Sequence, residues 1–96
     1  MGSSNKRNTI YMKTFDDLDF LPFHGDGVYA KIMFENGFGA SIVRSSSSYG
    51  GKNGLYEVAV LDTDGDLTYD TGVTDYVVGH LTPEEVTKVM KQIQTL

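Results

Sequence analysis

The pattern of apolar and polar positions predicts a β-hairpin over residues 28–44. Val28–Phe34 and Phe38–Arg44 flank the segment Glu35-Asn36-Gly37. A two-residue Asn36-Gly37 loop would mix apolar and small polar side chains on one face. A three-residue loop with a left-handed Gly37 and a bulge keeps that face apolar, so we expect the three-residue loop. The apolar face then carries Val28, Ala30, Ile32, Phe34, Phe38, Ala40 and Ile42.

A second hairpin is predicted over Leu55–Leu61 and Leu67–Thr71. A two-residue Asp64-Gly65 turn suits it, because Asp-Gly is a favoured pair for tight hairpin turns. This register places Tyr56, Val58 and Val60 on one face with Leu67, Tyr69 and Thr71. Residues 74–79 are expected to form a short helical turn or an irregular link.

The C-terminal residues have the pattern of an amphipathic helix. Thr82 is a suitable N-cap, Pro83 occupies the first helical position and Glu85 completes a capping box. Leu81 and Val86 stand at the two positions of a hydrophobic staple. A fifteen-residue helix is marginal alone, so its apolar stripe is expected to dock on the sheet. The stripe comprises Val86, Val89, Met90, Ile93 and Leu96, while Lys88, Lys91, Gln92 and Gln94 are expected to face water.

These elements together predict an α+β fold, an antiparallel β-meander of about four strands packed against a C-terminal amphipathic helix. Before the first hairpin, residues 14–23 are expected to form a short helical turn or an edge strand that ends before Pro22, and residues 24–27 a turn. Residues 12–96 are expected to form this single domain. Residues 1–11 are polar and aperiodic, and we interpret them as a disordered leader or expression tag before a native start at Met12.

Composition narrows the chemistry that the chain can perform. The 96 residues include no cysteine, which excludes disulfides, cysteine-ligated zinc and thiol nucleophiles. The net charge is −5, and it becomes −7 without residues 1–11, which contain the basic pair Lys6 and Arg7. Direct nucleic-acid binding is therefore not expected. The sequence has neither an apolar run of membrane-spanning length nor a signal-peptide pattern, so we expect no membrane association and a cytoplasmic location.

The segment Asp62-Thr63-Asp64-Gly65-Asp66 resembles the start of an EF-hand loop, where carboxylates alternate. The match then fails, because Leu67 stands where glycine is required and Val73 where a bidentate glutamate is required. A hairpin turn is the preferred interpretation. His24 and His80 lack the spacing of a helical metal pair, and no serine nucleophile motif accompanies them. No catalytic residue, metal site or cofactor is predicted.

Two regions around the first hairpin are candidates for contact with a partner. The connection over residues 45–54 is long and rich in small residues, and its contact candidates are Tyr49 and Lys52. The second face of the hairpin carries Tyr29 and Lys31. We interpret this face as a solvated surface partly covered by the N-terminal segment, and alternatively as a docking surface. The same face includes Met33, Ser41 and Val43.

The acidic hairpin is a third candidate contact region. Asp62, Asp64 and Asp66 lie near its turn, with Asp70 and Asp75 further along the chain. A negative patch can imitate nucleic-acid phosphates and block a basic groove. Acidic side chains also keep small proteins soluble, which is the preferred interpretation of this cluster.

Several strings of the sequence carry a resemblance to a known type of protein. They are Asn36-Gly37-Phe38-Gly39, Ser48-Tyr49-Gly50-Gly51, the segment Gly54–Leu61 and the ending Gly79–Val86. On these strings the chain from Met12 to Leu96 resembles small uncharacterised proteins encoded by bacteriophages and prophages. The resemblance implies a phage or bacterial cytoplasmic context and supports Met12 as a native start. It brings no functional residues to this chain.

The leading functional hypothesis is a small non-enzymatic accessory protein that acts by binding another protein. One alternative is an acidic inhibitor of a host nucleic-acid enzyme, of the anti-restriction or anti-CRISPR type, which would use the acidic hairpin. Another is an enzyme or small-molecule binder that uses His24 or His80. Pairing of an edge strand with a second copy would give a homodimer, which the sequence leaves open.

Overall fold

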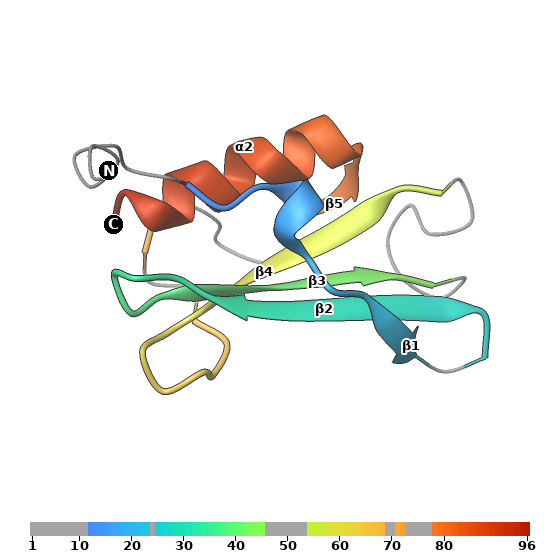
Figure 1. Ribbon diagram of the computed structural model, residues 1–96, viewed down its shortest axis with the longest axis horizontal. Helices are drawn as coiled ribbons and strands as arrows, with labels where there is room; N and C mark the ends of the chain where they lie inside the picture. The colour runs from blue at the N-terminus through green and yellow to red at the C-terminus, as the bar shows by residue number, and fades with distance from the viewer. Residues whose placement is uncertain (1–11, 24, 46–53, 69–70, 73–77) are drawn as a thin grey trace, which may run out of the picture.

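The computed structural model describes residues 12–23, 25–45, 54–68, 71–72 and 78–96 (Figure 1). The described strands form one antiparallel sheet in the order β1-β2-β3-β4-β5, and the single described α-helix covers one face of it (Figure 1). The predicted α+β meander is therefore confirmed, with five strands instead of about four. The elements are a 3₁₀ turn η1 (Phe15–Asp17), β1 (Leu21–Phe23), β2 (Gly27–Met33), β3 (Gly39–Arg44), β4 (Tyr56–Leu61), β5 (Val78–Leu81) and α2 (Pro83–Gln94).

The first hairpin has the predicted loop and register. The Phe34 N–H donates to the Phe38 carbonyl at 2.7 Å, and the Gly37 N–H donates to the Phe34 carbonyl at 3.0 Å. Gly37 has φ 94°, the left-handed conformation that this loop requires and that glycine adopts without steric cost. Ala30 lies opposite Ile42, so the apolar residues of β2 and β3 share one face.

The second hairpin differs from the prediction, because its loop also has three residues. The Asp62 N–H donates to the Asp66 carbonyl at 2.7 Å and Gly65 has φ 82°, which matches the first loop position by position. Leu61 therefore pairs with Leu67, one residue away from the predicted register. The cause is local: one oxygen of the Asp62 carboxylate accepts the N–H groups of Asp64 and Asp66, and this stabilises the longer loop.

Of the predicted strand Leu67–Thr71, residues 69–70 lie outside the described residues; the described part has a bridge at Leu67 and a hydrogen bond from the Thr68 N–H to the Val60 carbonyl. The remainder of the β4 edge pairs with β5, where Tyr56 lies opposite Leu81. Val78 and Gly79, predicted to be helical or irregular, are thus strand residues. One strand edge accepts one neighbour along its length, so β5 excludes the predicted pairing.

Residues 14–23 contain both of the proposed structures, a helical turn and an edge strand, one after the other. A 3₁₀ turn covers Phe15–Asp17, and the edge strand β1 follows and includes Pro22, so the expected end before this proline was wrong. Pro22 lies opposite Val28, whose hydrogen-bonding groups face β3. The proline nitrogen therefore points away from β2, where no N–H is needed.

The C-terminal helix has the predicted capping box. The Thr82 hydroxyl accepts the Glu85 N–H at 3.2 Å, and the Glu85 carboxylate accepts the Thr82 N–H at 2.9 Å. Val86, Met90 and Ile93 are fully buried, which confirms the apolar stripe up to its last member. They pack with Phe34, Ala40, Ile42, Val58, Val60 and Leu81 in the core.

Leu96 departs from the expected stripe. The helix ends at Gln94 and is twelve residues long, so Leu96 lies beyond it and is 42% exposed. The Asn36 side chain donates to the Ile93 carbonyl at 2.8 Å, which also accepts the Leu96 N–H at 3.2 Å, so the β2–β3 loop is bonded to the last helical turn.

Truncation of two members of the predicted stripe, one buried and one exposed, distinguishes a core side chain from a surface side chain. Met90→Ala should lower the free energy of unfolding by about 2–5 kcal/mol because it leaves a cavity in the core. Leu96→Ala should change it by less than about 0.5 kcal/mol. Urea denaturation measures both values. Equal losses would show that Leu96 is packed in the core.

The capping box predicts a pH dependence of stability. The pKa of Glu85 is lowered from its usual 4.5, chiefly by the Thr82 backbone N–H and then by the Thr82 hydroxyl. A lowered folded-state pKa adds stability above the unfolded pKa, and this contribution is lost as the pH falls through the folded-state value. The wild type should therefore be more stable than Glu85→Gln near neutral pH, and thermal unfolding should show the difference shrinking below pH 4.5. A difference that is constant with pH would contradict this role of the carboxylate.

Candidate protein-contact surface

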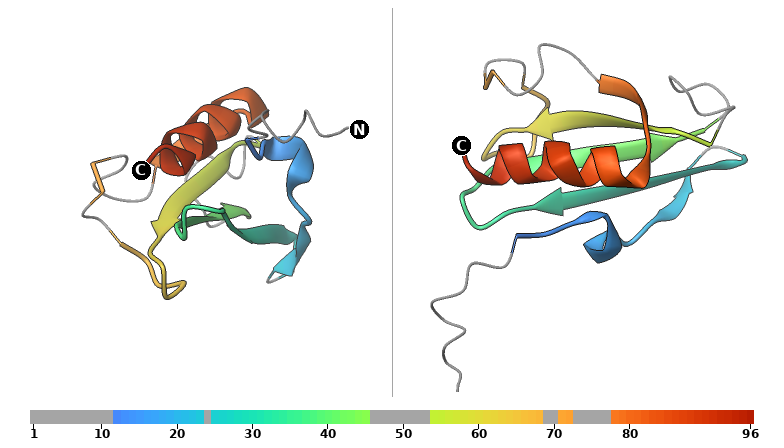
Figure 2. Two further views of the ribbon diagram at one scale, coloured as in Figure 1. Left: turned by 60° about the vertical axis from the view of Figure 1, so that its left-hand side comes forward. Right: turned by 90° about the horizontal axis from the view of Figure 1, so that it is seen from above.

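No helix of the described residues covers the side of the sheet opposite α2, here called the outer face (Figures 1 and 2). Side chains alternate along each strand, so the pairing registers determine which residues lie on it. Three of the four exposed large hydrophobic residues of the described chain belong to this face: Leu21 (53% exposed), Met33 (46%) and Leu67 (52%). The face comprises Leu21, Phe23, Tyr29, Lys31, Met33, Ser41, Val43, Glu57, Ala59, Leu61 and Leu67.

Tyr29 and Lys31, two predicted contact residues, lie on the outer face as expected. Tyr29 is half-buried and its ring packs edge-on against Phe23, with centroids 5.6 Å apart. Leu21 is directly opposite Tyr29 across the β1–β2 pair. Lys31 is exposed and adds a positive charge beside this apolar group. The arrangement combines aromatic, aliphatic and charged contacts, as the cores and rims of protein interfaces do.

Only part of the outer face is open. Ala59 and Leu61 of β4 are 6% and 1% exposed, although they lie on this face. The segment that follows β4 passes on the side of the sheet away from α2 (Figures 1 and 2). The open portion is therefore formed by β1, β2 and β3.

The N-terminal segment lies on the helix side, and the expectation that it partly covers the outer face was wrong for residues 12–20. Phe15, Leu18 and Phe20 pack against the core. The rings of Phe15, Phe20 and Tyr56 contact one another, with centroids 5.1 to 5.7 Å apart, and Arg44 stacks over Tyr56 at 5.4 Å. The apolar spacing of residues 15–20 serves the core beneath α2.

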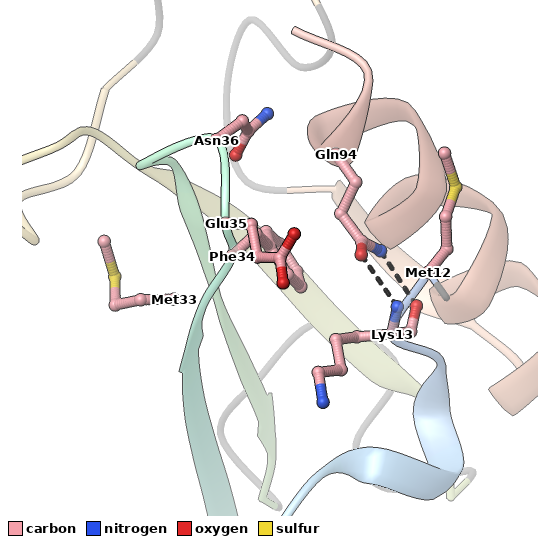
Figure 3. Close-up of a pocket in the computed structure, with 7 residues that line it drawn as sticks. All are labelled: Met12, Lys13, Met33, Phe34, Glu35, Asn36 and Gln94. Atoms are coloured by element: carbon pink, nitrogen blue, oxygen red, sulfur yellow. Dashed lines mark hydrogen bonds between the residues drawn. The ribbon is translucent and has the colours of Figure 1, made fainter. Parts of the chain in front are cut away.

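Gln94, predicted to face water, binds the backbone of this segment. Its amide oxygen accepts the Lys13 N–H at 2.7 Å and its amide nitrogen donates to the Lys13 carbonyl at 2.8 Å (Figure 3). Two turns earlier on the helix, the Thr87 hydroxyl accepts the Phe15 N–H at 3.0 Å. A polar stripe of α2 thus holds residues 13–15 in place.

A cavity of about 590 Å³ lies between this segment, the β2–β3 loop and the end of α2 (Figure 3). Apolar side chains and one residue of each charge, Lys13 and Glu35, line it. The full lining is Met12, Lys13, Met33, Phe34, Glu35, Asn36 and Gln94. The sequence pattern did not indicate this cavity, because it depends on contacts between the two ends of the chain.

The predicted acidic contact residues have different roles. The Asp62 carboxylate is engaged with the loop N–H groups at 2.9 and 3.0 Å, whereas Asp64 and Asp66 are exposed. Within the described residues, no group of three or more His, Cys, Asp or Glu side chains is arranged to hold a metal ion. The hairpin turn explains the position of Asp62 without a ligand.

The other predicted positions divide between described and undescribed residues. Tyr49, Lys52 and His24 lie outside the described residues, as do residues 1–11. His80 is exposed in β5 and has φ 61°, the left-handed region that is unusual for a residue other than glycine.

Comparison with family models, curated proteins and solved structures returned no match for this chain. No helix in the described part of the chain has the length and apolarity needed to span a membrane.

Substitutions in the acidic loop distinguish a structural carboxylate from surface charge. Asp62→Ala should lower the free energy of unfolding by about 1–3 kcal/mol, because two loop N–H groups lose a charged acceptor. Asp64→Ala is the matched control and should change it by less than about 0.5 kcal/mol. Chemical denaturation of the two variants compares the values. Equal effects would contradict the structural role assigned to Asp62.

Proposed function

We propose that this protein is a small non-enzymatic accessory protein that binds another protein through the open part of its outer face. The observation that carries the proposal is that Leu21 and Met33 of this open part, and Leu67 beyond β4, are exposed on the same face of the sheet. Exposed apolar side chains gathered on one face, with charged neighbours, are typical of interaction surfaces. Burying them against a partner releases about 25 cal/mol for each Å² of apolar surface.

The surroundings of this surface support a protein partner. Lys31 lies within it, and the exposed Asp64 and Asp66 lie close along the chain to Leu67 at one side. A polar rim around an apolar centre gives an interface its orientation. From the resemblance that the sequence strings carry, we also propose that the partner is a protein of a bacterial host cytoplasm.

An acidic inhibitor of a host nucleic-acid enzyme is a second candidate. The exposure of Asp64 and Asp66 favours it, since both carboxylates are available to a basic groove. It is the weaker candidate, because Asp62 is already engaged by its own loop.

Site-specific photocrosslinking tests the proposed surface. p-Benzoylphenylalanine in place of Val43, on the outer face, should yield a discrete adduct in bacterial host cells after irradiation. The same group in place of Lys88, an exposed position on α2, is the control and should yield none. Mass spectrometry of the adduct identifies the partner.

Two substitutions that change the charge of the surface show which residues the adduct requires. Leu21→Glu should abolish the adduct from position 43, while Asp64→Lys should leave it unchanged. An adduct that needs Asp64 but not Leu21 would favour the acidic inhibitor. Equal labelling from positions 43 and 88 would overturn the outer face as the contact surface.

A further inference from the structure

The edge of the sheet beside β1 is only partly covered. β1 pairs with β2 at Gly27, Val28 and Tyr29, but β2 continues to Met33. The chain before β1 leaves the plane of the sheet as η1 and packs on the helix side (Figure 2). The last residues of β2 therefore lack a strand neighbour on this side within the described chain.

The hydrogen-bond pattern identifies which backbone groups face this open edge. Phe34 bonds to Phe38 across the first hairpin. Bonding alternates along an antiparallel pair, so Ile32 also bonds to β3, while Lys31 and Met33 turn their N–H and C=O groups away from it. The hydrogen bonds of the described residues give these four groups no partner.

The cavity adjoins the same stretch of β2. Phe34 and Met33 line one side of it, although the Met33 side chain points away from the opposite side, which is lined by Met12 and Lys13 (Figure 3). Unpaired backbone groups beside a pocket for a side chain are the two components of strand addition: the backbone provides affinity and the pocket provides selectivity.

We propose that β2 accepts an extended segment of a partner protein as an added strand along Lys31–Met33. The proposal rests on the protein-binding function above and specifies the partner's chemistry. A residue of the added strand opposite Lys31 lies on the outer face, where an acidic side chain complements the lysine. The residue opposite Phe34 lies on the helix side and directs an apolar side chain toward the cavity.

The same geometry disfavours a second copy as the added strand. Bonded pairs at this edge join odd-numbered residues, so wherever Lys31 meets a strand residue of a second β2 that β1 does not already pair, that residue is another Lys31 or Met33. Neither pairing provides a negative charge for the lysine. A lysine on an edge strand is also a common device against self-association.

Amide hydrogen exchange tests the open edge in the free protein. The amides of Lys31 and Met33 should exchange faster than those of Ala30 and Ile32 by roughly tenfold or more, because only the latter two bond to β3. Slow exchange at Lys31 and Met33 would show that the edge is already paired and would overturn the proposal.

Two four-residue peptides test the added strand, one for each direction, and both end before Tyr29, which β1 already pairs. Acetyl-Phe-Val-Thr-Glu-amide places glutamate opposite Lys31 and phenylalanine opposite Phe34 in the antiparallel direction, and acetyl-Glu-Thr-Val-Phe-amide does so in the parallel direction. At millimolar concentration one of them should protect the Lys31 and Met33 amides from exchange. Its analogue with lysine in place of glutamate should bind about fivefold more weakly, and Lys31→Glu should reverse this preference. No protection, or no reversal, would overturn the proposal.

Two variants separate this site from the outer-face contact. Met33→Pro removes an outward N–H without removing a bond to β3, and should abolish peptide binding. Leu67→Glu is the matched control and should retain peptide binding.

The two experiments can fail separately. If the peptide binds while crosslinking from position 43 fails, strand addition is supported and the outer-face function is overturned. If crosslinking succeeds while the peptide does not bind, strand addition alone is overturned. A wild-type dimer that Met33→Pro converts to a monomer, measured by light scattering, would assign the edge to a second copy.

Discussion

The docking of α2 on one face of the sheet is the interaction on which the rest of the structure depends. Val86, Met90 and Ile93 are fully buried against the apolar side chains of β2, β3 and β4. Each buried side chain of this size contributes about 1.5–3 kcal/mol. The docked helix then holds residue 13 and the β2–β3 loop, since Gln94 binds the Lys13 backbone and the Ile93 carbonyl in the last helical turn accepts the Asn36 amide.

This docking makes the sheet asymmetric. One face is covered by the helix and residues 12–20, while the outer face is covered over β4 and open over β1, β2 and β3 (Figure 2). The core can therefore form without the exposed Leu21, Met33 and Leu67. Such residues are free to be selected for contact with a partner, whereas Val86 or Ile42 are constrained by packing.

Sequence patterns predicted correctly those elements that depend on residues close together in the chain. The loop between Phe34 and Phe38 and the capping box at Thr82 depend on residues three or four apart, and both are present. The position of β5 depends on competition between residues 67–71 and 78–81 for one edge of β4, which periodicity along the chain does not reveal. The same limit applies to the site. Tyr29 and Lys31 follow from one hairpin register. Leu21 depends on the β1–β2 pairing, which the irregular spacing of residues 14–23 does not indicate, and the cavity depends on contacts between segments far apart in the sequence.

The edges of the sheet differ in how well they are protected against pairing with a further strand. The outward position of Pro22 has no N–H, so β1 is a poor template for another strand. At the opposite edge, the bulge in the β4–β5 pair and the left-handed His80 interrupt the regular spacing that a neighbour needs. Among the described strands, the stretch from Lys31 to Met33 keeps regular geometry and both kinds of backbone group. The other edges therefore resist pairing with a further strand, whereas Lys31–Met33 has the geometry that the proposed added strand needs. The positive charge of Lys31 favours a strand with an acidic residue opposite it.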